Sequence, residues 1–228
     1  MKLSMKSRCV VIGASLLLAG YGMADAGEQQ HSGFISDYSG MEETKDALGE
    51  PVLRMVSPNF TSANYHALII EPVQLYPEPQ PSERVSQATL DDLVQYINSE
   101  LKRQLAQSIQ VTDTAGPGVA RLRIAITGVG AEAEGLKPYQ FIPAALVLTT
   151  ASRATSGTPH DATLNIEGEV TDSVNGGRLM VTVREGTGER LRKAAGGEKV
   201  VTLDTVKPLI DHWIKMSIKE TKEHLKTR

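Results

Sequence analysis

The chain has 228 residues, of which 40% are hydrophobic and 4% are aromatic, and its formal net charge at pH 7 is −3. This length is enough for one domain with its own core, and the composition excludes a disordered or fibrous protein. An acidic chain has no general electrostatic attraction to nucleic acid, so we expect no nucleic acid among its partners.

The N-terminus has the pattern of a secretory signal peptide over residues 1–26. Basic residues precede an apolar run over residues 10–19, and the small residues Ala24 and Ala26 suit signal peptidase, which predicts a mature chain that begins at Gly27. The alternative is an uncleaved signal that tethers the protein to a membrane, although the apolar run is shorter than the roughly 20 residues that a spanning helix needs. We expect cleavage and an exported, periplasmic protein.

A lipid anchor and cysteine chemistry are both disfavoured in the mature chain. The only cysteine, Cys9, lies inside the predicted signal, which leaves no disulfide and no thiol nucleophile. Residues 18–20 are similar to the box before the lipid-carrying cysteine of bacterial lipoproteins, but Tyr21 replaces that cysteine, so we expect no lipid anchor. The longest later apolar stretch, residues 141–148, is far shorter than the roughly 18 residues of a transmembrane segment, and we expect none in the mature chain.

The first part of the mature chain, residues 27–61, is predicted to be an extended N-terminal arm. It lacks sustained periodicity and contains several glycines and prolines. Residues 62–228 are predicted to form a single domain. Its first strand is expected within residues 66–71, where an apolar run is typical of a central strand buried on both faces. The prolines within residues 77–84 then indicate a loop.

A helix and a strand follow. Apolar residues at helical spacing predict a helix from Thr89, which can cap it, to about Ser108. Clean alternation over residues 121–127 predicts a half-buried strand. The periodicity of residues 141–153 does not decide between helix and strand, and we favour a short helix after Pro143.

The last predicted elements are a hairpin and a second helix. Residues 164–170 and 179–183 alternate on either side of the glycine-rich turn 172–177. Residues 206–218 form an amphipathic pattern, and a cap at Thr205 would leave no internal hydrogen bond lost to Pro208. The fold class is therefore α/β (α+β), a single domain with a mixed sheet of about four to five strands and two main amphipathic helices packed on it.

Motifs for catalysis and for cofactor binding are missing from the sequence. The histidines do not form a His-x-x-x-His pair, so no metal site is expected. Gly-x-Ser-x-Gly is absent, and Gly128 and Gly130 lack the third glycine of a dinucleotide-binding loop. We expect a protein that is not an enzyme and that uses no cofactor.

Three carboxylates of the hairpin, Glu167, Glu169 and Asp172, alternate on one face in the sequence. Such groups could act as acid and base if one of them were desolvated. The interpretation we prefer is a solvated sheet face with Arg184 nearby.

A candidate interaction surface is carried by aromatic and apolar residues in two segments. Tyr139, Phe141 and Ile142 lie beside an apolar run, either as core or as an exposed docking patch. Phe34 and Tyr38 of the predicted arm complete this candidate surface.

The segment Ser-Gly-Phe-Ile-Ser-Asp-Tyr-Ser at residues 32–39 resembles the opening of a bacterial envelope lipoprotein family known as Domain of Unknown Function 3313. The likeness continues at residues 67–73, 116–127 and 154–157 and at the turn that begins with Asp172. The resemblance implies a Gram-negative envelope protein that is usually lipidated, and Tyr21 departs from that pattern. It supplies no catalytic residues to transfer.

The function expected from these observations is that of a non-enzymatic periplasmic accessory protein that acts on an envelope protein partner. The alternative is a protein that binds a small apolar, lipid or glycan ligand in a pocket between helix and sheet. A hydrolase that uses the hairpin carboxylates Glu167 and Glu169 is a third hypothesis.

Overall fold

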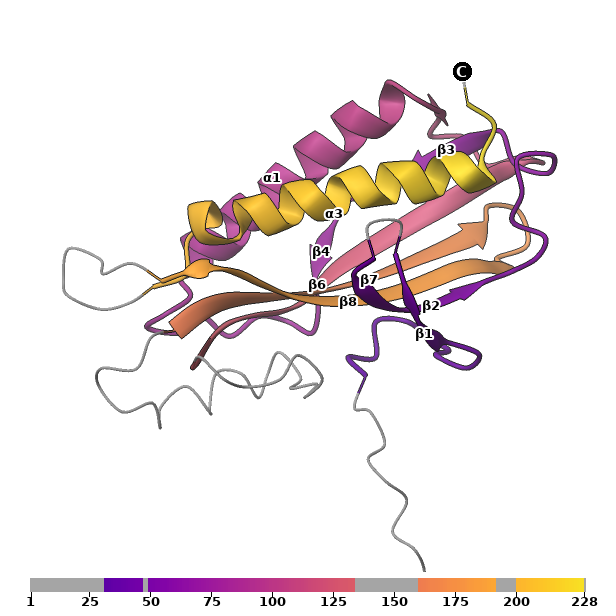
Figure 1. The fold of residues 1–228 in the computed structure, drawn as a ribbon. Helices are drawn as coiled ribbons and strands as arrows, with labels where there is room; N and C mark the ends of the chain where they lie inside the picture. Colours follow the sequence, from indigo (N-terminus) through magenta and orange to yellow (C-terminus); the bar gives the residue numbers. More distant parts are fainter. Residues whose placement is uncertain (1–30, 47–48, 134–159, 192–199, 228) are drawn as a thin grey trace, which may run out of the picture.

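The computed structural model describes residues 31–46, 49–133, 160–191 and 200–227. In this part of the chain, two long helices lie on one face of an eight-stranded sheet (Figure 1). The elements are β1 (Glu42–Lys45), β2 (Pro51–Val56), β3 (Ala67–Ile70), β4 (Gln74–Leu75), α1 (Gln87–Ala106), β5 (Gln110–Val111), β6 (Val119–Ala133), β7 (His160–Asp172), β8 (Arg178–Arg190) and α3 (Leu203–His224). The predicted fold class with two main helices is confirmed, but the sheet has more strands than the four to five expected.

The sheet has the strand order β1-β2-β8-β7-β6-β3-β5. The short strand β4 is not part of this order and pairs with β6. The long antiparallel strands β6, β7 and β8 lie at the centre of the sheet. The strand expected within residues 66–71 is β3, which runs parallel to β6 and has only the two-residue strand β5 on its other side. The strand that we expected to be central therefore lies near one edge of the sheet. The centre is formed by β6, β7 and β8, which are much longer and pair with one another along most of their length.

Two of the four additional strands, β1 and β2, come from the segment predicted to be an extended arm, and the other two are the short strands β4 and β5. Strands β1 and β2 form an antiparallel pair, and Gly49, which precedes β2, has φ +91°. Strand β2 then adds to the sheet through antiparallel pairing with β8, with Leu53 opposite Val183. This part of the predicted arm is thus paired with the domain and extends one side of its sheet.

Both helices begin earlier than predicted. The side chain of Ser86 caps α1 by accepting a hydrogen bond from the Thr89 N–H (3.1 Å), so Thr89 is a partner of the cap and not the cap itself. Thr202 is the N-cap of α3, three residues before the expected cap. Pro208 consequently lies inside the helix, where its missing N–H removes one internal hydrogen bond.

The larger core lies between the helices and the sheet. Apolar side chains of α1 and α3 form one buried cluster with side chains of β3, β6, β7 and β8. Two glycines of β8 allow α3 to approach closely: a Cβ at Gly188 would collide with the carbonyl oxygen of Thr205, and one at Gly186 would lie 2.7 Å from Cζ2 of Trp213. The helix therefore packs directly on the backbone of this strand.

The opposite face of the sheet is covered by residues 31–41, which we call the strap (Figure 1). Phe34 and Ile35 of the strap are buried in a second, smaller cluster with Ala125, Val181 and Val183. The described chain thus has helices on one face of its sheet and an irregular segment on the other.

Candidate functional site

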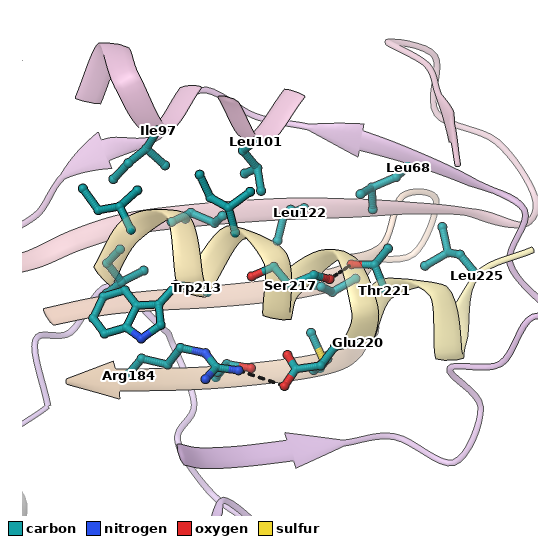
Figure 2. Close-up of a pocket in the computed structure, with 18 of the residues that line it drawn as sticks. Leu68, Ile97, Leu101, Leu122, Arg184, Trp213, Ser217, Glu220, Thr221 and Leu225 are labelled. Atoms are coloured by element: carbon teal, nitrogen blue, oxygen red, sulfur yellow. Dashed lines mark hydrogen bonds and ion pairs between the residues drawn. The ribbon is translucent and has the colours of Figure 1, made fainter. Parts of the chain in front are cut away.

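A pocket lies between α1, α3 and the sheet, with a volume of about 80 Å³ (Figure 2). Trp213 and Arg184 lie toward one end of it, and Leu68 and Leu225 toward the other. Most of the lining is apolar and comes from all three layers, as with Ile97 of α1 and Leu122 of β6. The helix–sheet interface is therefore not completely filled.

The hollow follows from the side-chain pattern of β7. Ile166, Gly168 and Val170 alternate toward the helices, and the middle position has no side chain. The sheet register places Gly168 between Ile124 of β6 and Thr182 of β8. A Cβ built at Gly168 would meet no atom closer than 3.9 Å. The missing side chain thus accounts for open space at the floor of the pocket.

Strand β8 supplies polar groups to the same pocket. Met180, Thr182 and Arg184 are alternate residues with side chains on one face, and all three line the pocket. The Thr182 residue is 9% exposed, and its hydroxyl has no hydrogen-bond partner among the residues that the structure describes. The pocket is therefore apolar with one unsatisfied neutral group.

A buried charge cluster closes the Arg184 end of the pocket. Arg184 donates hydrogen bonds to Asp46 Oδ2 (2.7 Å) and to Glu220 Oε1 (2.8 Å), and Glu220 also accepts one from Arg54 (3.0 Å). The Arg184, Asp46 and Glu220 side chains are 7%, 1% and 4% exposed. The cluster joins the β1–β2 hairpin, β8 and α3, and its charges sum to zero.

A larger cleft of about 510 Å³ adjoins the pocket. Arg184 and Trp213 line both spaces, so the two meet at these side chains. The outer cleft is more polar, with Glu50 and His212 among its lining residues. Trp213, the chain's only tryptophan, lines both spaces.

Two of the three hairpin carboxylates are buried, so the expectation of a solvated face is wrong for Glu167 and Glu169. Glu167 is 0% exposed and accepts hydrogen bonds from the Tyr38 hydroxyl (2.6 Å) and the Ser32 N–H (3.4 Å). Glu169 is 5% exposed and accepts one from Arg123 (3.1 Å). Burial, together with the bond to Glu167, raises the pKa of Tyr38. Glu167 thus anchors the strap on the sheet, whereas Glu169 pairs with the neighbouring strand β6.

The third carboxylate, Asp172, is not brought to the other two. A register irregularity between Val170 and Thr171 precedes it, and its side chain accepts a hydrogen bond from the Tyr65 hydroxyl (2.9 Å). Burial and this bond raise the pKa of Tyr65 to about 12. The alternation of the three acids in the sequence therefore did not indicate a common site.

Phe34, which we predicted to be part of an interaction surface, is buried in the structure. This residue is 6% exposed, with its ring beside Tyr76 (5.8 Å between centroids) and under the Arg123 guanidinium (4.8 Å). Tyr38 is half-buried and bonded to Glu167. Both contact the sheet because the strap needs apolar and polar anchors of its own. The other predicted site residues lie outside the described residues: Tyr21, Ala24, Ala26, Gly27, Tyr139, Phe141 and Ile142.

Two further expectations can be compared only with the described part of the chain. There, no cluster of three or more His, Cys, Asp or Glu side chains is arranged to hold a metal ion. No described helix combines the length and the apolar character that crossing a membrane requires. The short helix expected after Pro143 falls outside the described residues.

Sequence reasoning missed the pocket residues Gly168 and Thr182 and the charge cluster. A signal existed in each case. Gly168 interrupts an alternating apolar run, Thr182 and Arg184 stand among apolar residues of the hairpin, and Glu220 lies seven residues after Trp213 on the same side of the helix. Such interruptions of an apolar pattern mark the positions where a core is hollow or charged.

Comparison with known proteins gives an uncharacterized lipoprotein and several distantly similar structures. The uncharacterized lipoprotein YdcL of Escherichia coli strain K12 is 36% identical over 196 residues, which cover 86% of this chain and 87% of that protein. Among solved structures, the hypothetical protein CT253 from Chlamydia trachomatis is 10% identical with a TM-score of 0.38, covering 70% of this chain and 96% of its own. PelC from Paraburkholderia phytofirmans, solved as a dodecamer of a point variant, is 12% identical with a TM-score of 0.32, covering 60% and 79%. Structural likenesses this distant carry no argument about function.

The lipoprotein relative indicates an envelope location for this chain. It also speaks against the expectation, drawn from Tyr21, that no lipid anchor is present. The model of the family described as Protein of unknown function (DUF3313) matches residues 30–216, as the sequence resemblance predicted. The chain belongs to this family.

Proposed function

We propose that the protein is a non-enzymatic periplasmic protein that binds a small apolar ligand in the pocket between α1, α3 and the sheet. The observation that carries this proposal is the apolar hollow above Gly168, which lies at the helix–sheet interface and adjoins a surface cleft. Export through cleavage after Ala26 is part of the proposal.

A ligand is favoured over a protein partner because of the character of the described surface. Among the described residues, Val174 is the only large hydrophobic residue that is exposed. Apolar docking sites are usually contiguous patches of several such side chains. The described surface thus offers less support for an accessory protein that docks on an envelope partner than the pocket offers for a ligand.

The size of the two spaces limits the ligand. An apolar cavity of about 150 Å³ binds benzene, so a pocket of about 80 Å³ has room for roughly three to four heavy atoms. The outer cleft of about 510 Å³ lies within the range of roughly 300–1,000 Å³ that is usual for ligand sites. A ligand would therefore place an apolar segment in the pocket and the rest of its atoms in the cleft beside Trp213.

A non-enzymatic role is supported by the bonds of the hairpin acids. Glu167 and Glu169 are buried and are bonded to Tyr38 and Arg123. Acid and base catalysis needs groups within hydrogen-bond reach of a substrate. The pocket lies on the opposite face of the sheet from these two carboxylates.

Fluorescence of Trp213 gives a direct test of binding. We expect 1-propanol and 1-chloropropane, which are small enough for the pocket, to change the emission of this tryptophan in a saturable way and to raise the melting temperature. Gly168→Ala should lower the affinity for both ligands by about tenfold, equivalent to about 1.4 kcal/mol, because the methyl group of the alanine occupies the floor of the pocket.

The matched control is Gly116→Ala. A Cβ at Gly116 would lie 4.0 Å from its nearest neighbour, as free as at Gly168, but this residue is not part of the pocket. Ligand affinity of the control should equal that of the wild type. The proposal would be abandoned if neither probe gave a saturable change, or if the two glycine variants bound alike.

A further inference from the structure

We infer that the ligand segment in the pocket carries one uncharged hydrogen-bonding oxygen, of the alcohol or ester type, that pairs with the hydroxyl of Thr182. This inference rests on the proposed function and specifies the chemistry of its ligand. It starts from a residue that is 9% exposed, lines the pocket and has no hydrogen-bond partner among the described residues.

Thr182 lies beside the open space at the floor of the pocket, and its hydroxyl oxygen is buried among the surrounding atoms without a partner in the described part of the chain. Its register partner on β7 is Gly168, the residue without a side chain at the floor of the pocket. Met180 and Arg184, two positions away on either side along β8, line the same pocket. A buried hydroxyl without a partner is unfavourable and uncommon in native proteins. An oxygen of a ligand above Gly168 would satisfy it.

The charges around the pocket exclude an ionised ligand group. Arg184 is bonded to Asp46 and Glu220, and Glu220 is also bonded to Arg54. These two positive and two negative charges balance each other. A carboxylate or an ammonium group would lose its hydration without meeting an unpaired opposite charge, and burying an ion in that way is costly. A neutral group at Thr182 avoids this cost.

A pair of probes separates the hydrogen bond from simple filling of the pocket. The molecules 1-propanol and 1-chloropropane have the same number of heavy atoms, but only the alcohol has a hydroxyl group. We expect the full-length wild-type protein to bind the alcohol about threefold to tenfold more tightly, as one neutral hydrogen bond provides. Trp213 fluorescence gives both affinities, and an NMR titration that follows the Thr182 signals locates the contact.

Three variants identify the group responsible. Thr182→Val keeps the shape of the side chain and removes the hydroxyl, so we expect it to lose the preference for the alcohol and to keep its affinity for 1-chloropropane. Thr182→Ser keeps a hydroxyl and should keep the preference. Thr127→Val is the matched control, because Thr127 is also buried with an unpartnered hydroxyl among the described residues but is not part of the pocket. It should bind both probes like the wild type.

The outcomes distinguish this inference from the proposed function. Equal wild-type affinities for the two probes, or an unchanged preference in Thr182→Val, would overturn the inference and leave the apolar pocket as a binding site. Failure of both probes to bind the wild type would overturn both proposals. A crystal structure soaked in 1-propanol that shows only an ordered water at Thr182 would also refute the inference.

Discussion

The two faces of the sheet are covered in different ways. On one face, α1 and α3 bury a large apolar cluster and leave a pocket above Gly168. On the other, the strap buries a small cluster and depends on polar anchors. Helices satisfy their own backbone groups, so they can cover a sheet by apolar contact alone. An irregular segment cannot cover a sheet by apolar contact alone, because its backbone N–H groups need hydrogen-bond partners.

Tyr38 shows how the strap meets this need. Its hydroxyl accepts hydrogen bonds from the N–H groups of Gly33 (3.1 Å) and Ile35 (3.2 Å) and donates one to Glu167 (2.6 Å). One side chain thus organises the strap and fixes it to β7. The comparison teaches that buried polar groups hold the strap in place, whereas most of the buried contacts on the helix face are apolar.

The largest effect is expected from breaking the charge cluster on the helix face. Arg184→Leu leaves Asp46 and Glu220 buried without this cation, and we expect the free energy of unfolding to fall by about 3–5 kcal/mol. Urea denaturation measures this change. In the control, Arg103→Leu, the arginine is 56% exposed and paired with Glu100 at the surface, so the loss should be much smaller. Similar losses in the two variants would contradict this account of the cluster.

A smaller and more local effect is expected on the strap face. Tyr38→Phe leaves Glu167 buried without its strongest partner, and we expect a loss of about 1–3 kcal/mol. Hydrogen exchange should become faster in residues 31–41 while α1 and α3 stay protected, because the strap detaches without global unfolding. Tyr76→Phe, which alters a tyrosine of the same cluster, is the control. Equal exchange in the two variants would show that the Tyr38 bond does not hold the strap.

The smallest effect concerns pH. The N–H group of Asn175, more than that of Val174 and the Tyr65 hydroxyl, lowers the pKa of Asp172 below 3.8. A carboxylate with a lowered pKa in the folded state contributes stability above its unfolded pKa and loses it as the pH falls through the folded value. Asp172→Asn should therefore reduce the drop in melting temperature between about pH 5 and pH 2.

The control for the pH experiment is Asp91→Asn, which alters an exposed aspartate of α1. Its melting temperature should follow that of the wild type across the same pH range. If the melting temperature of Asp172→Asn fell between about pH 5 and pH 2 as much as that of the wild type, hydrogen bonds to this carboxylate would not contribute to the pH dependence.

The regular elements could be predicted because their signals are local. Apolar spacing located α1 and α3, and alternation on both sides of a glycine-rich turn located the β7–β8 hairpin. The β1–β2 hairpin was missed because its strands are short and its pairing partner, β8, is distant in the chain. The burial of Glu167 was missed for a related reason: alternation identifies a face of a strand, but not what covers that face.

The sequence by itself determined the family, from segments along most of the chain, and the two helices and the long hairpin, since these elements depend on residues close together in the chain. Only the tertiary structure decided that Gly168 and Thr182 share a hollow and that Arg184 meets Asp46 and Glu220, which are 138 and 36 positions away. Strand register and helix docking create these contacts. The free energy of a buried group depends on the neighbours that they bring to it, and no local pattern specifies those neighbours.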